Sequence, residues 1–426
     1  NASIRVDQSN LFGSDPSVQF KPIWSVGGAW SMGEENFMQA ATWLDRLNLR
    51  FSYGLSGNSP DPGLGGPYDI LYPVNNSSFA SLGQGYVVIT PANDKLIWEK
   101  TRTINAGIDF DLFGNRLSGS IDAYFKNTTD LLGDVAMHPS SGWSTALANF
   151  GSMRNRGVEI TLNSLNLKIR DFTWRTNFTL TYNKNKVTEL YIDDANTPSD
   201  RINANFVEGY AAGALFAYRW AGLDEMGDPQ VYDENGNKVK LSSDLTNPEA
   251  LRYMGSIQPL WYGGLTNQFS YKGFTFSFMF VYNLGHKMRN DVNSFWSNRL
   301  TGNIHKDFAK RWKEPGDEAY TNIPAYISNG NQATTRRETT FYRYADINVL
   351  NASYVKLRDL TLSYTLPTNI ARKLLCDNIR VRFQAANLFC IAANGEGIDP
   401  EAHNLRYGYR GDHYGPSFSI GLNIDL

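Results

Sequence analysis

The feature that most constrains the fold is a strict alternation of apolar and polar residues over runs of about ten residues. The clearest example is RTINAGIDFDLFGNRLSGSIDAYFKNTTDLL, which covers residues 102–132. Apolar side chains such as Ile104 and Ile108 recur at every second position, and the residues between them are mostly polar or small. Successive side chains of an extended strand point to opposite faces, so this period predicts strands with one apolar and one polar face. The two runs predict a hairpin that turns at Gly114-Asn115.

The same alternation recurs along the chain and predicts about eleven full strands, plus the end of one more at residues 3–7. They are expected near residues 20–30, 46–56, 102–112, 116–126, 157–167, 172–183, 260–271, 274–284, 353–366, 379–389 and 418–426. Short links alternate with long loops, which are expected at about 57–100, 127–155, 184–258, 285–352 and 391–415. Up-and-down strands with short turns at one rim and long loops at the other produce this order. A helix is expected over 34–44 and a short helical turn over 369–375.

Alternation alone does not say which face is inside, because a soluble barrel buries its apolar face and a membrane barrel turns that face to lipid. Runs of about 9–11 residues match strands that cross a bilayer at a tilt, whereas soluble strands most often have about 5–6 residues. The mean hydropathy of −0.39 is compatible with a membrane barrel, because alternating strands average to a polar composition. The sequence therefore favours an all-β, transmembrane antiparallel β-barrel over a soluble β protein.

Longer motifs are spread over nearly the whole chain: LDRLNLRFSYGLSGN at Leu44, LIWEKTRTINAGIDFDLFGNRLSGSIDAYFKNTTDLL at Leu96, NFGSMRNRGVEITL at Asn149, YVKLRDLTLSYTLP at Tyr354 and ANLFCIAANGEGIDPE at Ala386. Together they resemble the SusC/RagA family of TonB-dependent outer-membrane transporters. The resemblance implies a barrel of about 22 strands, of which residues 1–426 would supply about the last half. The plug domain, the TonB box and the N-terminal strands would precede Asn1. One departure is Leu426, where outer-membrane barrels usually end in an aromatic residue.

The same resemblance implies TonB-dependent import of an oligosaccharide or oligopeptide across the outer membrane of a Gram-negative bacterium. A SusD-like surface lipoprotein would cover the long loops, and the TonB complex would act through the N-terminal part. Two alternatives stay open, a passive porin and a soluble carbohydrate-binding protein. The near balance of 40 Lys and Arg against 42 Asp and Glu carries no footprint of a nucleic-acid partner.

No catalytic arrangement and no cofactor are expected, because the 5 histidines are scattered over separate loops without metal-ligand spacing. Cys376 and Cys390 flank a predicted strand and are expected to be free thiols. In the run DENGN, Asp233, Asn235 and Asn237 alternate around a glycine, as in part of a calcium loop. The glutamate that closes such a loop is missing, so a plain turn is favoured over a Ca²⁺ site.

In a barrel with lipid outside, charged residues on the polar faces point into the lumen, where contact with the plug is favoured over contact with cargo. These residues are Asp109, Asp111, Asp122, Arg175, Arg380 and Arg382. Cargo contacts are expected in the long loops, where aromatic rings stack on sugars and arginines donate paired hydrogen bonds. The candidates are Trp143, Trp296, Arg343 and Tyr344, with packing inside their own loops as the competing role.

Overall fold

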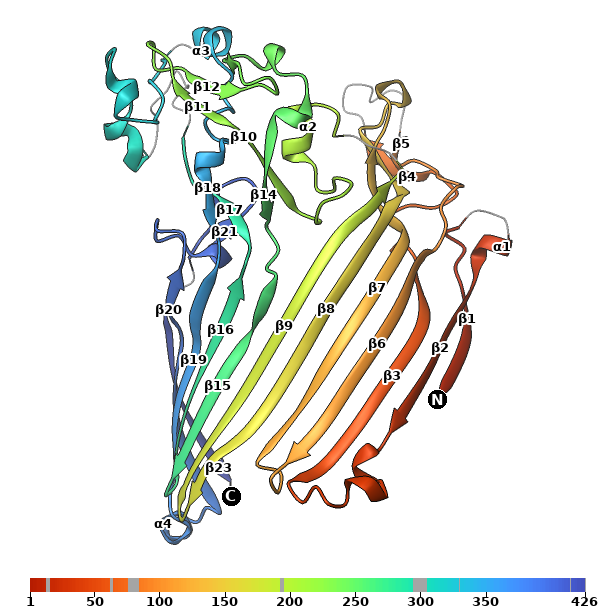
Figure 1. The fold of residues 1–426 in the computed structure, drawn as a ribbon, viewed down its shortest axis with the longest axis vertical. Helices are drawn as coiled ribbons and strands as arrows, with labels where there is room; N and C mark the ends of the chain where they lie inside the picture. Colours follow the sequence, from red (N-terminus) through yellow and green to blue (C-terminus); the bar gives the residue numbers. More distant parts are fainter. Residues whose placement is uncertain are drawn as a thin grey trace.

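The computed structural model describes residues 1–12, 16–61, 64–75, 84–191, 195–293, 305–328, 330–413 and 415–425. Its main feature is a 12-stranded antiparallel sheet in which each strand lies beside its neighbours in the chain (Figure 1). The strands, in sheet order, are β1 (Ala2–Gln8), β2 (Phe20–Trp30), β3 (Leu44–Asn58), β6 (Glu99–Leu112), β7 (Leu117–Ala136), β8 (Thr145–Ile169), β9 (Phe172–Leu190), β15 (Trp261–Tyr271), β16 (Phe274–Leu284), β19 (Tyr354–Thr365), β20 (Asn378–Ala392) and β23 (Ser417–Asp425). Eleven strands plus the end of one more were expected, so the predicted all-β antiparallel barrel sheet is confirmed.

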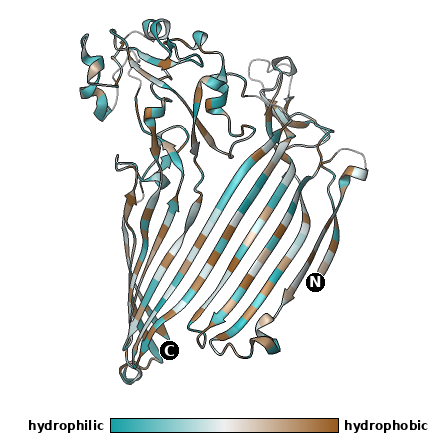
Figure 2. Ribbon diagram, in the orientation of Figure 1, coloured by the Kyte–Doolittle hydropathy of each residue, from teal (hydrophilic) through white to brown (hydrophobic). Residues whose placement is uncertain are grey.

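The apolar face of the sheet is exposed rather than covered by other parts of the described chain. Ile104 is 43% exposed on β6, and Ile420 on β23 is 81% exposed. Figure 2 shows hydrophobic and hydrophilic residues alternating along β6 to β9. Soluble monomers rarely expose a contiguous apolar patch larger than a few hundred Å². A sheet with this face is therefore suited to contact with lipid.

The hairpin turn predicted at Gly114-Asn115 joins β6 to β7. Phe113, Gly114 and Asn115 have φ angles of 58°, 67° and 59°. This left-handed conformation costs glycine nothing and is tolerated by asparagine, which explains the residue types at the turn.

The loop predicted at 127–155 is wrong, because β7 continues to Ala136 and β8 begins at Thr145. The pairing of the two strands shifts register twice between Thr128 and Leu132. A bulge of this kind adds residues to one strand and changes the face to which the following side chains point. The apolar alternation breaks there although the backbone pairing continues. A prediction based on alternation therefore placed the strand ends too early. In the same way β9 continues beyond residue 184, to Leu190.

The helices of the chain are short, and no helix in the described residues is long and apolar enough to cross a membrane. The helix predicted over 34–44 is wrong: η1 (Met32–Glu34) and η2 (Asn36–Met38) are single 3₁₀ turns in that region. The helical turn predicted over 369–375 is confirmed by α4 (Thr368–Lys373). The other α-helices are α1 (Pro16–Gln19), α2 (Pro198–Asn203) and α3 (Gly330–Arg336).

The long connections gather beyond one rim of the sheet and form a layer of their own, here called the loop layer (Figure 1). Its strands are β4 (Ile70–Asn75), β5 (Gln84–Thr90), β10 (Ala214–Tyr218), β11 (Trp220–Leu223), β12 (Pro229–Tyr232), β13 (Lys238–Val239), β14 (Leu251–Ser256), β17 (Lys287–Arg289), β18 (Val349–Asn351), β21 (His403–Asn404) and β22 (Tyr409–Arg410). A compact apolar core lies in this layer and includes Phe216, Val231 and Phe341, each at most 2% exposed. The loop layer is therefore folded, and it can hold functional side chains in fixed positions.

Candidate functional site

Three separate loops of the loop layer meet around Arg289, the last residue of β17. The backbone N–H of Arg289 donates to Leu405 O at 2.9 Å, and its carbonyl lies 2.8 Å from His403 Nε2. On the other side, Asn290 N donates to Asn348 O at 2.7 Å. These bonds join the segments that follow β16, precede β18 and follow β20, so residues far apart in the chain are brought to one place.

Arginine and tyrosine side chains alternate at this meeting point. The Arg289 guanidinium carbon lies 4.6 Å from the ring centre of Tyr344, and that of Arg343 lies 5.4 Å from the same ring. Arg343 also lies 4.3 Å from the ring centre of Tyr409, whose ring is 6.4 Å from that of Tyr407. We call Arg289, Arg343, Tyr344, Tyr407 and Tyr409 the arginine–tyrosine stack. It leads from Arg289, which is 1% exposed, to Tyr409, which is 56% exposed.

The charges of the stack are not neutralised by carboxylates of the described residues. Arg289 Nη2 donates to Phe216 O at 2.8 Å, while its Nε and Nη1 have no hydrogen-bond partner there. Arg343 Nη2 donates to Tyr407 O at 2.7 Å. Nearby Arg406 donates to Ala204 O at 2.7 Å and keeps its own Nη2 unpartnered. Burial lowers the pKa of Arg289 to about 10, so it stays cationic near pH 7. The site therefore offers positive charge and flat rings to a ligand rich in acceptor oxygens.

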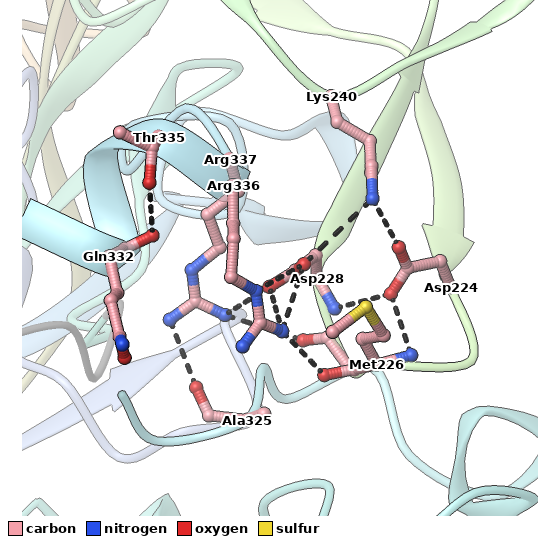
Figure 3. A network of polar contacts seen from close by, with 10 residues as sticks. Asp224, Met226, Asp228, Lys240, Ala325, Gln332, Thr335, Arg336 and Arg337 are labelled. Carbon is pink, nitrogen blue, oxygen red and sulfur yellow. Dashed lines mark hydrogen bonds and ion pairs between the residues drawn. The ribbon is translucent and has the colours of Figure 1, made fainter. Parts of the chain in front are cut away.

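In a second charged cluster of the loop layer, every charged side chain lies close to one of opposite sign (Figure 3). Asp228, which is 0% exposed, accepts from Arg336 Nη2 at 3.0 Å and lies 3.5 Å from Arg337 Nη1. Lys240 Nζ lies 2.6 Å from Asp224 and 3.9 Å from Asp228. We call these five residues the Asp228 network. It connects the turn between β11 and β12 to α3, and its internal pairing points to a structural role.

Of the four loop candidates, the structure brings together Arg343 and Tyr344. Trp143 lies elsewhere, at the tip of the β7–β8 hairpin, where its backbone N–H donates to Ser141 Oγ at 3.2 Å. Trp296 lies outside the described residues. Sequence reasoning missed Arg289, Tyr407 and Tyr409. The run RYGYR at 406–410, in which basic and aromatic residues alternate, was the available signal.

The aspartates predicted to face the lumen lie together on the polar face of β6 and β7. Arg50 on β3 binds Asp109 through two hydrogen bonds of 2.7 and 2.9 Å and reaches Asp122 at 3.0 Å. Beside this group, Arg46 pairs with Asp111 at 2.7 Å. The arginine partners were missed, although LDRLNLR places both on the polar phase of its strand. All three aspartates are therefore ion-paired, in a group of three carboxylates and two arginines that spans three strands.

The arginines predicted for the same face lie on other strands. Arg175 of β9 is paired in register with Gln268 of β15. Arg380 Nε donates to Thr365 Oγ1 at 3.1 Å, and Arg382 Nη2 donates to Gln384 Oε1 at 2.8 Å. Arg380 and Arg382 thus bind neutral side chains, unlike Arg46 and Arg50.

The proposed calcium residues form a tight turn between β12 and β13. Asp233 Oδ1 accepts from Asn235 N at 2.9 Å and from Asn237 N at 2.7 Å, and Oδ2 accepts from Asn237 Nδ2 at 2.9 Å. The Asn237 side-chain bond is the largest cause of a lowered pKa at Asp233. Within the described residues no group of three His, Cys, Asp or Glu side chains is placed to hold a metal. Ca²⁺ binding at this turn stays a prediction. The two cysteines are free, as expected.

Comparison with known proteins gives one consistent result. The family described as TonB dependent receptor-like, beta-barrel matches residues 1–388. TonB-dependent receptor P39 of Formosa agariphila is 27% identical over 487 residues, covering 100% of this chain and 44% of the receptor. TonB-dependent receptor SusC of Bacteroides thetaiotaomicron is 28% identical over 456 residues, covering 100% of this chain and 42% of SusC. A solved structure described as the RagAB peptide transporter superposes with a TM-score of 0.77 at 26% identity, over 99% of this chain and 45% of that one. The chain spans less than half the length of these relatives.

Proposed function

Because the chain belongs to the family of TonB-dependent receptors, we propose that it is part of an outer-membrane importer that takes up a nutrient with energy from the TonB complex. The observation that carries the proposal is the 12-stranded sheet with an exposed apolar face in a chain of this family. The apolar face meets lipid, and the polar face lines the lumen. Further strands and a plug, supplied by the rest of the protein, close the barrel.

The paired charges of the polar face suit contact with a plug. Arg46 and Arg50 with their three aspartate partners present ion-paired groups in fixed positions, which suit hydrogen bonds to a protein surface. Arg380 and Arg382, which bind neutral side chains, face the same lumen, as does Arg175.

We place cargo at the arginine–tyrosine stack. The exposed ring of Tyr409 offers a stacking face, and Arg343 offers donors beside it. An oligopeptide supplies carboxylate and carbonyl acceptors, and an oligosaccharide supplies hydroxyl oxygens and an apolar ring face. A SusD-like lipoprotein covers the loop layer and delivers this cargo. We infer that Trp143, at the tip of the β7–β8 hairpin, contacts that lid rather than cargo in the stack.

Uptake by cells that produce the full-length protein tests the proposal. Fluorescent oligopeptides and oligosaccharides are supplied to cells with and without a functional TonB protein. We expect accumulation of one cargo class in the presence of TonB and at least a tenfold lower rate in its absence. Equal uptake without TonB would indicate a passive porin and overturn the proposal. Uptake that requires TonB but is unchanged in Arg343→Ala would overturn only the cargo site.

A further inference from the structure

Unpaired basic side chains gather on the apolar face of the sheet, at the end of that face nearest the loop layer. We call them the basic belt: Arg102 of β6, Arg154 and Arg156 of β8, and Lys184 and Lys186 of β9. All of them are exposed. They belong to the phase of their strands that carries apolar side chains further along, such as Ile104, Val158 and Leu180.

The register of the sheet sets these residues side by side in rows. Arg156 is the direct partner of Lys184, and Arg154 is the direct partner of Lys186. Arg102 joins the second row through Asn127, which pairs with both Arg102 and Arg154. The row below the belt is apolar and runs through Ala106, Ala123, Val158, Tyr182 and Trp261. The basic belt therefore begins where the apolar face stops.

No residue of the basic belt forms an ion pair or a side-chain hydrogen bond with another described residue. Their neighbour Lys100 does pair, with Asp130 at 3.0 Å, so the chain neutralises an adjacent cation and leaves the belt open. Arg154 contacts the ring of Phe125, its guanidinium carbon 5.4 Å from the ring centre. That cation–π contact holds the charged group over the last apolar ring of this face.

Like charges directly opposite one another destabilise a sheet unless a counter-ion is present. The basic belt has two such pairs in succession, Arg156–Lys184 and Arg154–Lys186. Strands added at the sheet edges β1 and β23 do not reach this face, because β6 to β9 lie in the interior of the sheet (Figure 1). The counter-ions of the basic belt therefore come from the surroundings of the apolar face of the sheet.

We propose that the basic belt binds the phosphate groups of lipid headgroups in the leaflet next to the loop layer. The inference rests on the proposed function only in taking the apolar face as the lipid-facing wall. Phosphate groups lie in the headgroup region, which borders the hydrocarbon core of a membrane. The basic belt borders the apolar row through Val158, Tyr182 and Trp261 in the same way. Arginine and lysine side by side suit phosphate, because guanidinium binds phosphate oxygens in pairs and ammonium acts as a point charge.

The test uses the full-length protein in neutral detergent and measures bound lipid by mass spectrometry after gel filtration. The probes are a lipid A with two phosphates and the same lipid with none. The test variant is Arg154→Gln/Arg156→Gln/Lys184→Gln/Lys186→Gln. The matched control removes unpaired cations at the opposite rim: Lys168→Gln/Arg170→Gln/Lys272→Gln/Lys373→Gln. Resistance of the unheated barrel to SDS reports folding.

We expect the unmodified protein and the control to retain at least tenfold more phosphorylated than dephosphorylated lipid, with the difference lost at high salt. In the test variant this preference should disappear. An unchanged preference in the test variant, or an equal loss in the control, would overturn the proposal. Complete release by millimolar inorganic phosphate would also overturn it, in favour of a site for the free anion. If the test variant does not fold, Lys184→Gln/Lys186→Gln is judged by the same criteria. Bound lipid is read without transport, so failure of TonB-dependent uptake leaves this result intact.

Discussion

Two arginines of the loop layer are equally buried and are held in opposite ways. Arg337 and Arg289 are each 1% exposed. Arg337 lies 3.5 Å from a carboxylate oxygen of Asp228, which is itself completely buried. Arg289 forms no ion pair with a described residue and lies against the ring of Tyr344 instead. The same buried charge is compensated in one region and left open in the other.

This difference separates a structural site from a candidate binding site. A buried ion pair rarely adds much net stability, but loss of one partner is costly because a charge is left in the interior. The Asp228 network therefore fixes the positions of α3 and of the strands β11 to β13. The arginine–tyrosine stack retains a charge that its own surroundings do not use, as expected where an external acceptor completes the site.

The largest effect is expected when the compensated region is broken. Asp228→Ala leaves Arg336 and Arg337 without their shared carboxylate and should lower the free energy of unfolding of the loop layer by about 3–5 kcal/mol. Hydrogen exchange of β12 and α3 measures this. The control is Glu249→Ala, which removes an exposed partner of Arg201 and should cost at most about 1 kcal/mol. Similar losses in the two variants would contradict the structural role of Asp228.

A smaller effect, on binding rather than stability, is expected in the open region. Arg343→Ala removes the guanidinium between Tyr344 and Tyr409 and should weaken cargo binding about tenfold, or about 1.4 kcal/mol. Titration of the full-length protein with the imported cargo measures the affinity. Arg252→Ala, which removes an exposed arginine paired with Asp346, should leave the affinity unchanged. Equal weakening by both substitutions would mean that net charge, rather than the stack, binds cargo.

Acid should weaken the open region through its buried histidines. Burial lowers the pKa of His286 to about 4 and is also the main cause of a lowered pKa at His403. An unfolded histidine has a pKa of about 6.5, so below that pH the unfolded chain binds protons that the folded one excludes. The stability around β17 and β21 should therefore fall as the pH drops from about 6.5 towards 4. Thermal unfolding of His286→Gln/His403→Gln should show a weaker pH dependence, and an unchanged one would refute this assignment.

The smallest change in stability is expected for Arg289→Met. No described carboxylate loses a partner, and replacement of a buried charge by an apolar side chain is often neutral. The free energy of unfolding should stay within about 1 kcal/mol of the original value. Cargo affinity should fall less than in Arg343→Ala, because the buried Arg289 acts only through the ring of Tyr344. A loss as large as that of Asp228→Ala would show that Arg289 is structural and would remove the contrast between the two regions.

The sheet was predictable from the sequence because strand, face and register all follow one local period. The prediction failed between Thr128 and Leu132, where bulges change the phase of the side chains while the backbone ladder continues. In the loop layer no such period exists. Arg343 and Tyr344 could be selected by residue type, but Arg289 and Tyr409 reach them only through contacts between separate loops. Composition does not indicate contacts of that kind. The run RYGYR, in which basic and aromatic residues alternate, was the local sequence feature that could have indicated Tyr407 and Tyr409.

The separate core of the loop layer has a consequence for the evolution of such proteins. The 12-stranded sheet requires hydrogen-bonded strands and the correct polarity on each face. Many different residue types meet that requirement at each position. The loop layer is held by its own buried cluster around Phe216, Val231 and Phe341. Substitutions near Arg343 and Tyr409, where we propose that cargo binds, should therefore leave the strands of the sheet undisturbed. Under the proposed function, such substitutions would change the cargo while the strands of the sheet stay as they are.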